Sequence, residues 1–275
     1  MRESGWGWGA FFFDFDNDGD LDALNGNGMD DPETTDDDWA VNQKMKLYVN
    51  QGYEEKFKMV DEATLRGIEN TQENRGAMTF DYDHDGDLDI FVVNHGEAPS
   101  FYRNDGGNYY DFIRVEVYEH KTGRSSIGTS VFLQLNEDDE TEQIREIGSA
   151  AAFLGQGENV AHFGLGLRGI DEHIYRIRVQ YFTLSEDISV NSSFDQVNSS
   201  ATKHNLEFYN IQPRSTLIVY KTDTTEMVEQ NNDVSNRKKF PICEDVLHKM
   251  ESTSVLLEEA KRARVTKKIG FKNAL

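Results

Sequence analysis

Hydrophobic and polar residues alternate in short runs along most of this chain, which predicts strands rather than helices. The clearest run is 111–117, where Ile113, Val115 and Val117 share one face of a predicted strand. Three further runs of this kind lie at 130–135, 174–182 and 215–220. Glycines and short acidic segments separate them as turns. We therefore predict an all-β unit over 110–221, either a β-sandwich or a small β-barrel.

The first 109 residues carry shorter strands, which are rich in aromatic and β-branched side chains. Predicted strands lie at 8–13, 57–61, 76–80 and 90–93, and a further short apolar strand is predicted directly after 14–22. Segments 46–52 and 101–107 are each predicted to be a strand that runs into a turn. Several short strands in each of two similar units suggest successive blades of a β-propeller. The acidic stretch 30–38 interrupts the first unit and is predicted to be an exposed insertion loop.

The last part of the chain, 222–275, has a different pattern. Residues 223–236 are polar and are predicted to be a linker. Residues 244–264 place apolar side chains at helical spacing and end in basic residues, which predicts an amphipathic α-helix.

One nine-residue pattern, Asp-x-Asp-x-Asp-Gly-Asp-Leu-Asp, occurs twice at an offset of 67 residues. The two copies, which we call loop 1 and loop 2, span 14–22 and 81–89. Five carboxylates so close together repel one another, so a folded chain needs a cation among them. The glycine at position 6 permits a sharp turn, and ligands that are all oxygen favour Ca²⁺. The candidate metal ligands are Asp14, Asp16, Asp18, Asp20, Asp22, Asp81, Asp83, Asp85, Asp87 and Asp89.

An EF-hand loop opens in the same way, but it requires a Glu at position 12 and a helix on each side. Position 12 is Asn25 in the first copy and Val92 in the second. The flanking segments are predicted strands. We therefore expect calcium loops within β-hairpins, with an acidic solvated turn as the alternative.

The formal net charge of −22 makes nucleic acid and anionic membranes poor partners. No apolar run is long enough to span a membrane. Cys243 is the only cysteine, which excludes an intrachain disulfide and a CxxC site. No signal peptide precedes the first strand, whereas the sequons at Asn191 and Asn198 would matter in a secreted protein.

Some motifs suggest chemistry that their surroundings do not support. Residues 164–169 fit G-x-G-x-x-G, but a predicted strand follows where a dinucleotide site needs a helix, so we interpret them as a turn. His84 occupies a non-ligand position of loop 2 and is expected to point outward. His162 is expected to be packed or hydrogen-bonded rather than catalytic. No nucleophile–base motif is present, and no catalytic or cofactor-binding residue is predicted.

Residues 8–10 leading to loop 1, the segments 47–52 and 57–63, and loop 2 resemble FG-GAP/VCBS repeats, which form blades of calcium-binding β-propellers. The resemblance implies that positions 1, 3, 5 and 9 of each loop bind Ca²⁺ through their side chains. At position 7, where Asp20 and Asp87 stand, it implies a backbone carbonyl ligand. Two blades cannot close a ring, so we expect this chain to be the C-terminal part of a longer protein.

The second unit is similar to the ASPIC/UnbV module, through 112–115, 124–129, 145–149 and 162–166. In the cartilage acidic protein family this module follows FG-GAP/VCBS repeats, as it does here. The likeness weakens at 180–183, where the family has a Trp-Pro-Ser-Gly turn.

Together these features predict a calcium-binding, non-catalytic interaction or adhesion protein. Its partner is expected to be another protein or an extracellular-matrix component, and the full-length protein is expected to be extracellular. Two alternatives remain open: an accessory protein or enzyme of secondary metabolism, and an intracellular scaffold.

Overall fold

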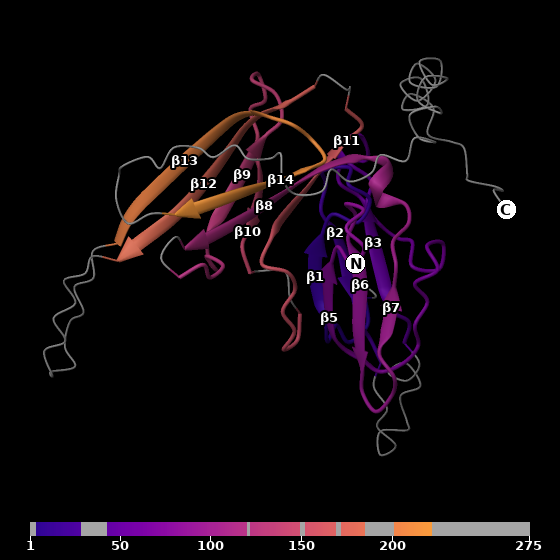
Figure 1. Ribbon diagram of the computed structural model, residues 1–275. Coiled ribbons are helices and arrows are strands. Elements are labelled where there is room, and N and C mark those ends of the chain that lie inside the picture. The colour runs from indigo at the N-terminus through magenta and orange to yellow at the C-terminus, as the bar shows by residue number, and fades with distance from the viewer. Residues whose placement is uncertain are drawn as a thin grey trace, which may run out of the picture. The chain divides into compact units, whose positions relative to one another are not determined.

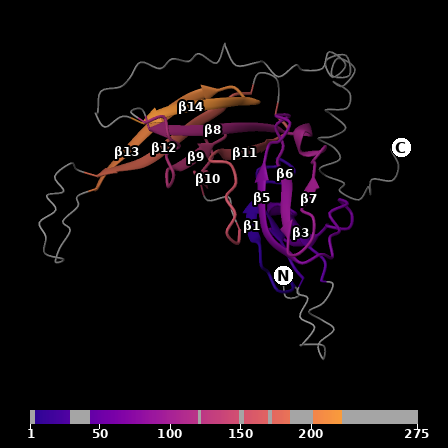
Figure 2. The same cartoon turned by 60° about the horizontal axis from the view of Figure 1, so that its bottom comes forward.

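The computed structural model describes residues 4–28, 43–119, 122–148, 152–168, 172–184 and 201–221. These residues form an all-β structure of strands β1 to β14 and two short 3₁₀ turns, η1 (Tyr53–Glu55) and η2 (Gly107–Tyr109) (Figures 1 and 2). The predicted insertion loop, both sequons and the predicted C-terminal helix lie outside the described residues.

The first two sheets are built from residues 10–102, and each is an antiparallel meander. The first sheet contains β1 (Ala10–Phe13), β2 (Asp22–Asn25), β3 (Lys46–Asn50) and β4 (Met59–Asp61). The second sheet contains β5 (Asn74–Phe80), β6 (Asp89–Asn94) and β7 (Ser100–Tyr102). Loop 1 connects β1 to β2, and loop 2 connects β5 to β6. Both loops therefore lie on β-hairpins, as predicted, with no helix beside them.

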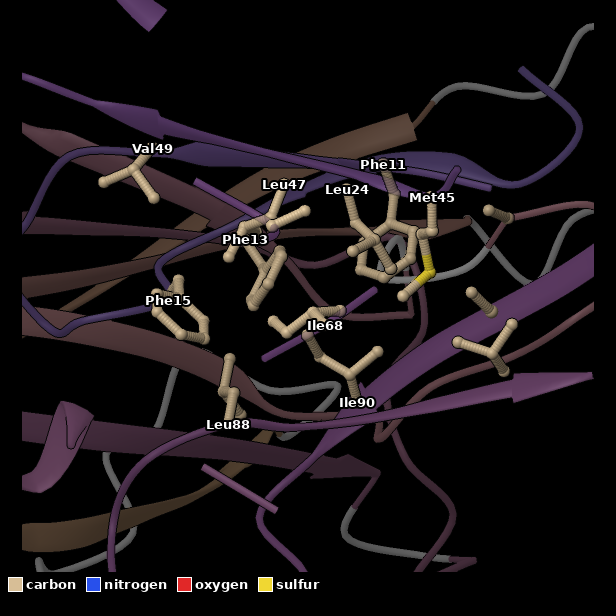
Figure 3. Packing of buried hydrophobic residues seen from close by; sticks show 14 residues of the cluster. Phe11, Phe13, Phe15, Leu24, Met45, Leu47, Val49, Ile68, Leu88 and Ile90 are labelled. Carbon is tan, nitrogen blue, oxygen red and sulfur yellow. The ribbon is translucent and has the colours of Figure 1, made fainter. Parts of the chain in front are cut away.

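The first and second sheets pack against each other around one hydrophobic core. The face that the second sheet buries is not equivalent, in the repeat, to the face that the first sheet buries. Figure 3 shows Phe11, Phe13 and Leu47 of the first sheet on one side of this core and Ile90 of the second sheet on the other. The alternation along each strand explains the arrangement, because residues two apart share a face. The buried members are Phe11, Phe13, Phe15, Leu24, Met45, Leu47, Val49, Ala63, Ile68, Ala77, Leu88, Ile90, Val92 and Ala152.

The remaining strands form two sheets between which the chain crosses repeatedly. The third sheet has the order β11 (Ala161–Gly166), β8 (Asp111–Glu119), β14 (Ser215–Lys221). The fourth has the order β10 (Gln143–Glu146), β9 (Ser130–Gln134), β12 (Ile174–Leu184), β13 (Ala201–Ile211). β14 runs parallel to β8, whereas the other pairs of these sheets are antiparallel.

Both of these sheets contribute side chains to a second hydrophobic core. Ile113, Val115 and Val117 are buried in it from the third sheet, as their alternation predicts, and Leu133 and Ile177 enter it from the fourth. The two sheets remain separate, so the sandwich is confirmed and the barrel alternative is wrong for the described residues. We call residues 111–221 the sandwich region.

Three strands of the sandwich region escaped prediction: β10, β11 and β13. β13 lies at the edge of its sheet, and its apolar alternation is short: Leu206 and Phe208 pack against the core, whereas residues 202–205 are polar. Its pairing with β12 defines it instead. β10 is similarly short and half-exposed.

The interpretation of 164–169 as a turn is wrong at its start, because Gly164, Leu165 and Gly166 belong to β11. A β-bulge interrupts the register with β8 between Gly164 and Gly166. The glycines allow close backbone contact with loop 1, described below. β12 follows, as predicted, where a dinucleotide site would need a helix. The described residues contain no helix with the length and apolarity needed to cross a bilayer.

Candidate metal centre

The two aspartate loops adopt the same backbone conformation. Position 4 is left-handed in both, with φ 57° at Asn17 and 60° at His84. Position 6 has φ 97° at Gly19 and at Gly86, a region that favours glycine. The sequence repeat is therefore also a structural repeat.

The same hydrogen bonds brace both loops through the aspartate at position 9. Asp22 accepts one bond from the backbone N–H of position 2 and another from Asn50 N, both at 2.7 Å. Asp89 accepts the equivalent bonds, from position 2 and from Asn104 N, both at 2.8 Å. Each asparagine begins a turn after the third strand of its sheet. The closing aspartates are thus fixed by backbone amides.

In loop 1, the structure brings together the carboxylates of positions 1, 3 and 5. One oxygen each from Asp14, Asp16 and Asp18 lie within 4.8 Å of one another. Asp14 and Asp22 are buried, whereas Asp20 is half-buried and outside this cluster.

In loop 2, the structure brings together positions 1, 3 and 9, namely Asp81, Asp83 and Asp89, within the same 4.8 Å limit. Asp85 instead accepts a hydrogen bond of 2.6 Å from Asn108 Nδ2. Asp87 is fully buried and accepts a bond of 3.1 Å from the backbone N–H of Asn108.

The donor set suits a hard divalent cation such as Ca²⁺. Both first-position aspartates, Asp14 and Asp81, leave Oδ1 buried without a hydrogen-bond partner. A buried carboxylate oxygen without a partner carries a large desolvation cost. A cation held among the converging carboxylates would offset that cost in both loops. Asp87 Oδ1 is another such atom.

The raised pKa values of the loop aspartates also fit a site for a cation. Burial raises the pKa of Asp14 to about 7, although Arg145 lowers it and the neighbouring Asp18 and Asp16 raise it further. Burial also raises the pKa of Asp22 to about 8. In loop 2, burial and the neighbouring Asp85 raise the pKa of Asp87 to about 8. Without a cation, the loops therefore resist full ionisation at neutral pH.

The sandwich region contacts loop 1 through the backbone of β11. Gly164 N donates to Asp14 Oδ2 at 3.0 Å, and Gly166 N donates to Asn17 O at 2.8 Å. A Cβ on Gly164 would lie 2.3 Å from Asp14 Oδ2, so only glycine fits there. Arg145 Nη2 lies 3.9 Å from the same Asp14 oxygen and, because it is nearly buried, experiences little screening.

The sandwich region contacts loop 2 through a buried ion pair. Arg114 Nη1 lies 2.7 Å from Asp81 Oδ2, and Arg114 Nη2 binds both oxygens of Glu158 at 2.9 and 3.0 Å. Although burial lowers the pKa of Arg114, Glu158 and Asp81 raise it above its ordinary value overall. The first aspartate of each loop thus turns Oδ2 toward the sandwich region, while its Oδ1 is buried without a hydrogen-bond partner.

Asn17 of loop 1 contacts both loop 2 and the sandwich region. Its side-chain Nδ2 donates to the carbonyls of Gly86, in loop 2, at 2.9 Å and Gly107 at 3.1 Å. Its Oδ1 lies 2.7 Å from Nε2 of His162 on β11. His162 is buried against Phe112, and burial together with nearby Arg114 lowers its pKa to about 3. The expectation that His162 is packed and hydrogen-bonded is confirmed, and its imidazole is neutral.

Sequence reasoning missed most of these supporting residues. His84 is exposed, as expected, but Asn17 at the equivalent position is buried. The shared Asn-x-Gly after β3 and β7 could have identified the two bracing asparagines. Arg114 and Glu158 gave no such signal, because they come from distant segments.

The fold and this site define an all-β protein in which two acidic loops lie on tandem sheets, followed by a β-sandwich. Residues 119–200 match the family model "ASPIC and UnbV". This confirms the predicted resemblance for that stretch, and the structure shows that β8 and β14, on either side of it, share the same core. A search of curated proteins found no match.

Proposed function

We propose that this protein is a calcium-binding, non-catalytic interaction protein whose two aspartate loops hold Ca²⁺ as a structural ion. The observation that carries the proposal is the pair of equivalent atoms, Asp14 Oδ1 and Asp81 Oδ1, each buried without a hydrogen-bond partner beside other carboxylates. A carboxylate bound to Ca²⁺ stays ionised and is poorly suited to proton transfer, which favours a structural role.

Asp14, Asp16 and Asp18 would supply side-chain oxygens in loop 1, with Asp22 closing the shell. Asp81, Asp83 and Asp89 would do so in loop 2, with Asp85 at position 5. The ion would neutralise the like charges and stabilise both hairpins against the sandwich region.

We further propose that the first two sheets are successive blades of a propeller of the FG-GAP/VCBS type. Three facts support this: each is an antiparallel meander, each carries the loop between its first two strands, and opposite faces of the two sheets pack together. An extracellular location fits, since extracellular modules bind Ca²⁺ with dissociation constants of about 10⁻⁴ to 10⁻³ M. The partner would be another protein or a matrix component.

Thermal unfolding with and without Ca²⁺ tests the proposal. Calcium in excess over its dissociation constant should raise the melting temperature, because it binds the folded state. The double variant Asp16→Ala/Asp83→Ala should remove this response. An identical wild-type melting curve in Ca²⁺ and in chelator would refute the proposal.

A further inference from the structure

The second sheet exposes an aromatic surface on the face that points away from the first sheet. We call it the aromatic face, and it consists of Met78, Phe80, Tyr82, Phe91 and Phe101. Cross-strand register aligns Met78 with Phe91 and Phe91 with Phe101. Tyr82 is 60% exposed and Phe101 is 43% exposed, and their ring centroids lie 5.2 Å apart. Clustered exposed aromatic side chains mark interaction surfaces.

The internal repeat shows what this surface is shaped to contact. Phe15 of the first repeat is equivalent to Tyr82, and Leu47 is equivalent to Phe101 through the pairing of β3 and β7 with their neighbours. In the first repeat, these two residues are only 6% and 0% exposed. Both are buried in the core that the first and second sheets share. The same positions in the second sheet have kept their large apolar side chains but are exposed.

The internal repeat also shows which kind of surface packs against these residues. The second sheet covers the first with small and aliphatic residues, among them Ala77 of β5. The equivalent position on β1 is Ala10, which is exposed, and the neighbouring Phe12 on the same face is 58% exposed. One chain therefore presents both halves of a contact that it already makes once internally.

We propose that the aromatic face binds the Ala10/Phe12 face of a second copy of this chain, which continues the established contact between the first and second sheets. Such a contact is heterologous, so it joins copies head to tail and leaves one face free at each end. This proposal rests on the proposed function, because it names a partner for the interaction protein. Its evidence is the exposure of the two faces and the internal repeat of the first two sheets, so it does not depend on a bound cation.

Sedimentation velocity over a range of protein concentrations, in calcium buffer, tests this proposal. The wild-type chain should associate as its concentration rises. Tyr82→Ser/Phe101→Ser should weaken association about tenfold or more, as expected for aromatic side chains at the centre of an interface. The matched control is Tyr53→Ser/Phe57→Ser, which removes another exposed aromatic pair, 6.0 Å apart, outside the aromatic face.

A mixing experiment tests the head-to-tail geometry. Phe12→Ser should also prevent self-association, and an equimolar mixture of Phe12→Ser with Tyr82→Ser/Phe101→Ser should form dimers that do not grow further. A wild-type chain that stays monomeric would overturn the proposal and leave the face to a different sheet or protein. Association that survives the aromatic-face variant would also overturn it. Failure of calcium binding has a separate signature: an unchanged melting temperature with association intact.

Discussion

Replacing Asn17 with glycine removes the side chain that joins the two loops and the sandwich region. Glycine accepts the φ of 57° at this position, so the substitution introduces no backbone strain. His84→Gly is the matched control, because His84 occupies the same loop position with φ 60° but is exposed. Both substitutions add the same freedom to the unfolded chain, which cancels in the comparison.

The expected difference follows from three buried contacts. Asn17 donates to two carbonyls, at 2.9 and 3.1 Å, and pairs with His162 at 2.7 Å. Each such hydrogen bond contributes about 1 kcal/mol net, and a buried group left unpaired costs about 1–3 kcal/mol. We therefore expect Asn17→Gly to lower the free energy of unfolding by about 3 kcal/mol more than His84→Gly.

Urea and thermal unfolding of calcium-saturated protein, followed by circular dichroism, measure this difference. About 3 kcal/mol corresponds to a gap of about 6–12 °C between the two melting temperatures for a domain of this size. Equal stabilities for the two variants would refute the view that Asn17 holds the loops and the sandwich region together.

Three further predictions concern the same site. Gly86→Ala should destabilise the protein more than Gly19→Ala, by about 1–3 kcal/mol in urea unfolding. Both glycines have φ 97°, but a Cβ on Gly86 would lie 1.9 Å from the Phe112 ring, whereas a Cβ on Gly19 would meet a flexible side chain at 3.0 Å. Equal losses of unfolding free energy in the two variants would contradict this prediction. Arg114→Met should cost about 3–5 kcal/mol by leaving the buried carboxylate of Asp81 and the half-buried carboxylate of Glu158 unpaired. Arg178→Met, whose ion pair is more exposed, should cost about 1 kcal/mol or less. Similar costs for the two variants would count against the pair between Arg114 and Asp81. In chelator, the free energy of unfolding should fall as pH rises from 5 to 8. The buried loop aspartates, with pKa raised to about 7–8, still hold protons that the unfolded chain, with pKa near 3.9, has released. The melting-temperature gain from Ca²⁺ should therefore grow with pH, and a gain that shrinks would contradict the raised pKa values.

Local pattern was sufficient to predict strands with a long apolar alternation, such as β8, but not β11, whose glycines were interpreted as a turn. Alternation at Ile113, Val115 and Val117 placed all three on the buried face of β8. The spacing of carboxylates and glycines likewise placed both loops on hairpins. β13 was missed because its first half is polar and only Leu206 and Phe208 alternate; pairing with β12 supplies its hydrogen bonds.

The environment of the loops could not be predicted in the same way. Asn17 and His84 occupy equivalent positions, yet one is buried and the other exposed. The difference arises because β11, which begins 139 residues after the end of loop 1, packs on Asn17. Arg114 and Glu158 meet Asp81 for the same reason. Contacts between distant segments have no local signature, whereas turn geometry does.

Calcium titration followed by isothermal calorimetry measures directly whether the two loops bind Ca²⁺. Two ions should bind per wild-type chain, because two loops present converging carboxylates. One ion should bind to Asp16→Ala, one to Asp83→Ala, and none to the double variant. Absence of calcium binding by the folded wild-type chain, or a stoichiometry that neither substitution changes, would contradict the proposed calcium sites.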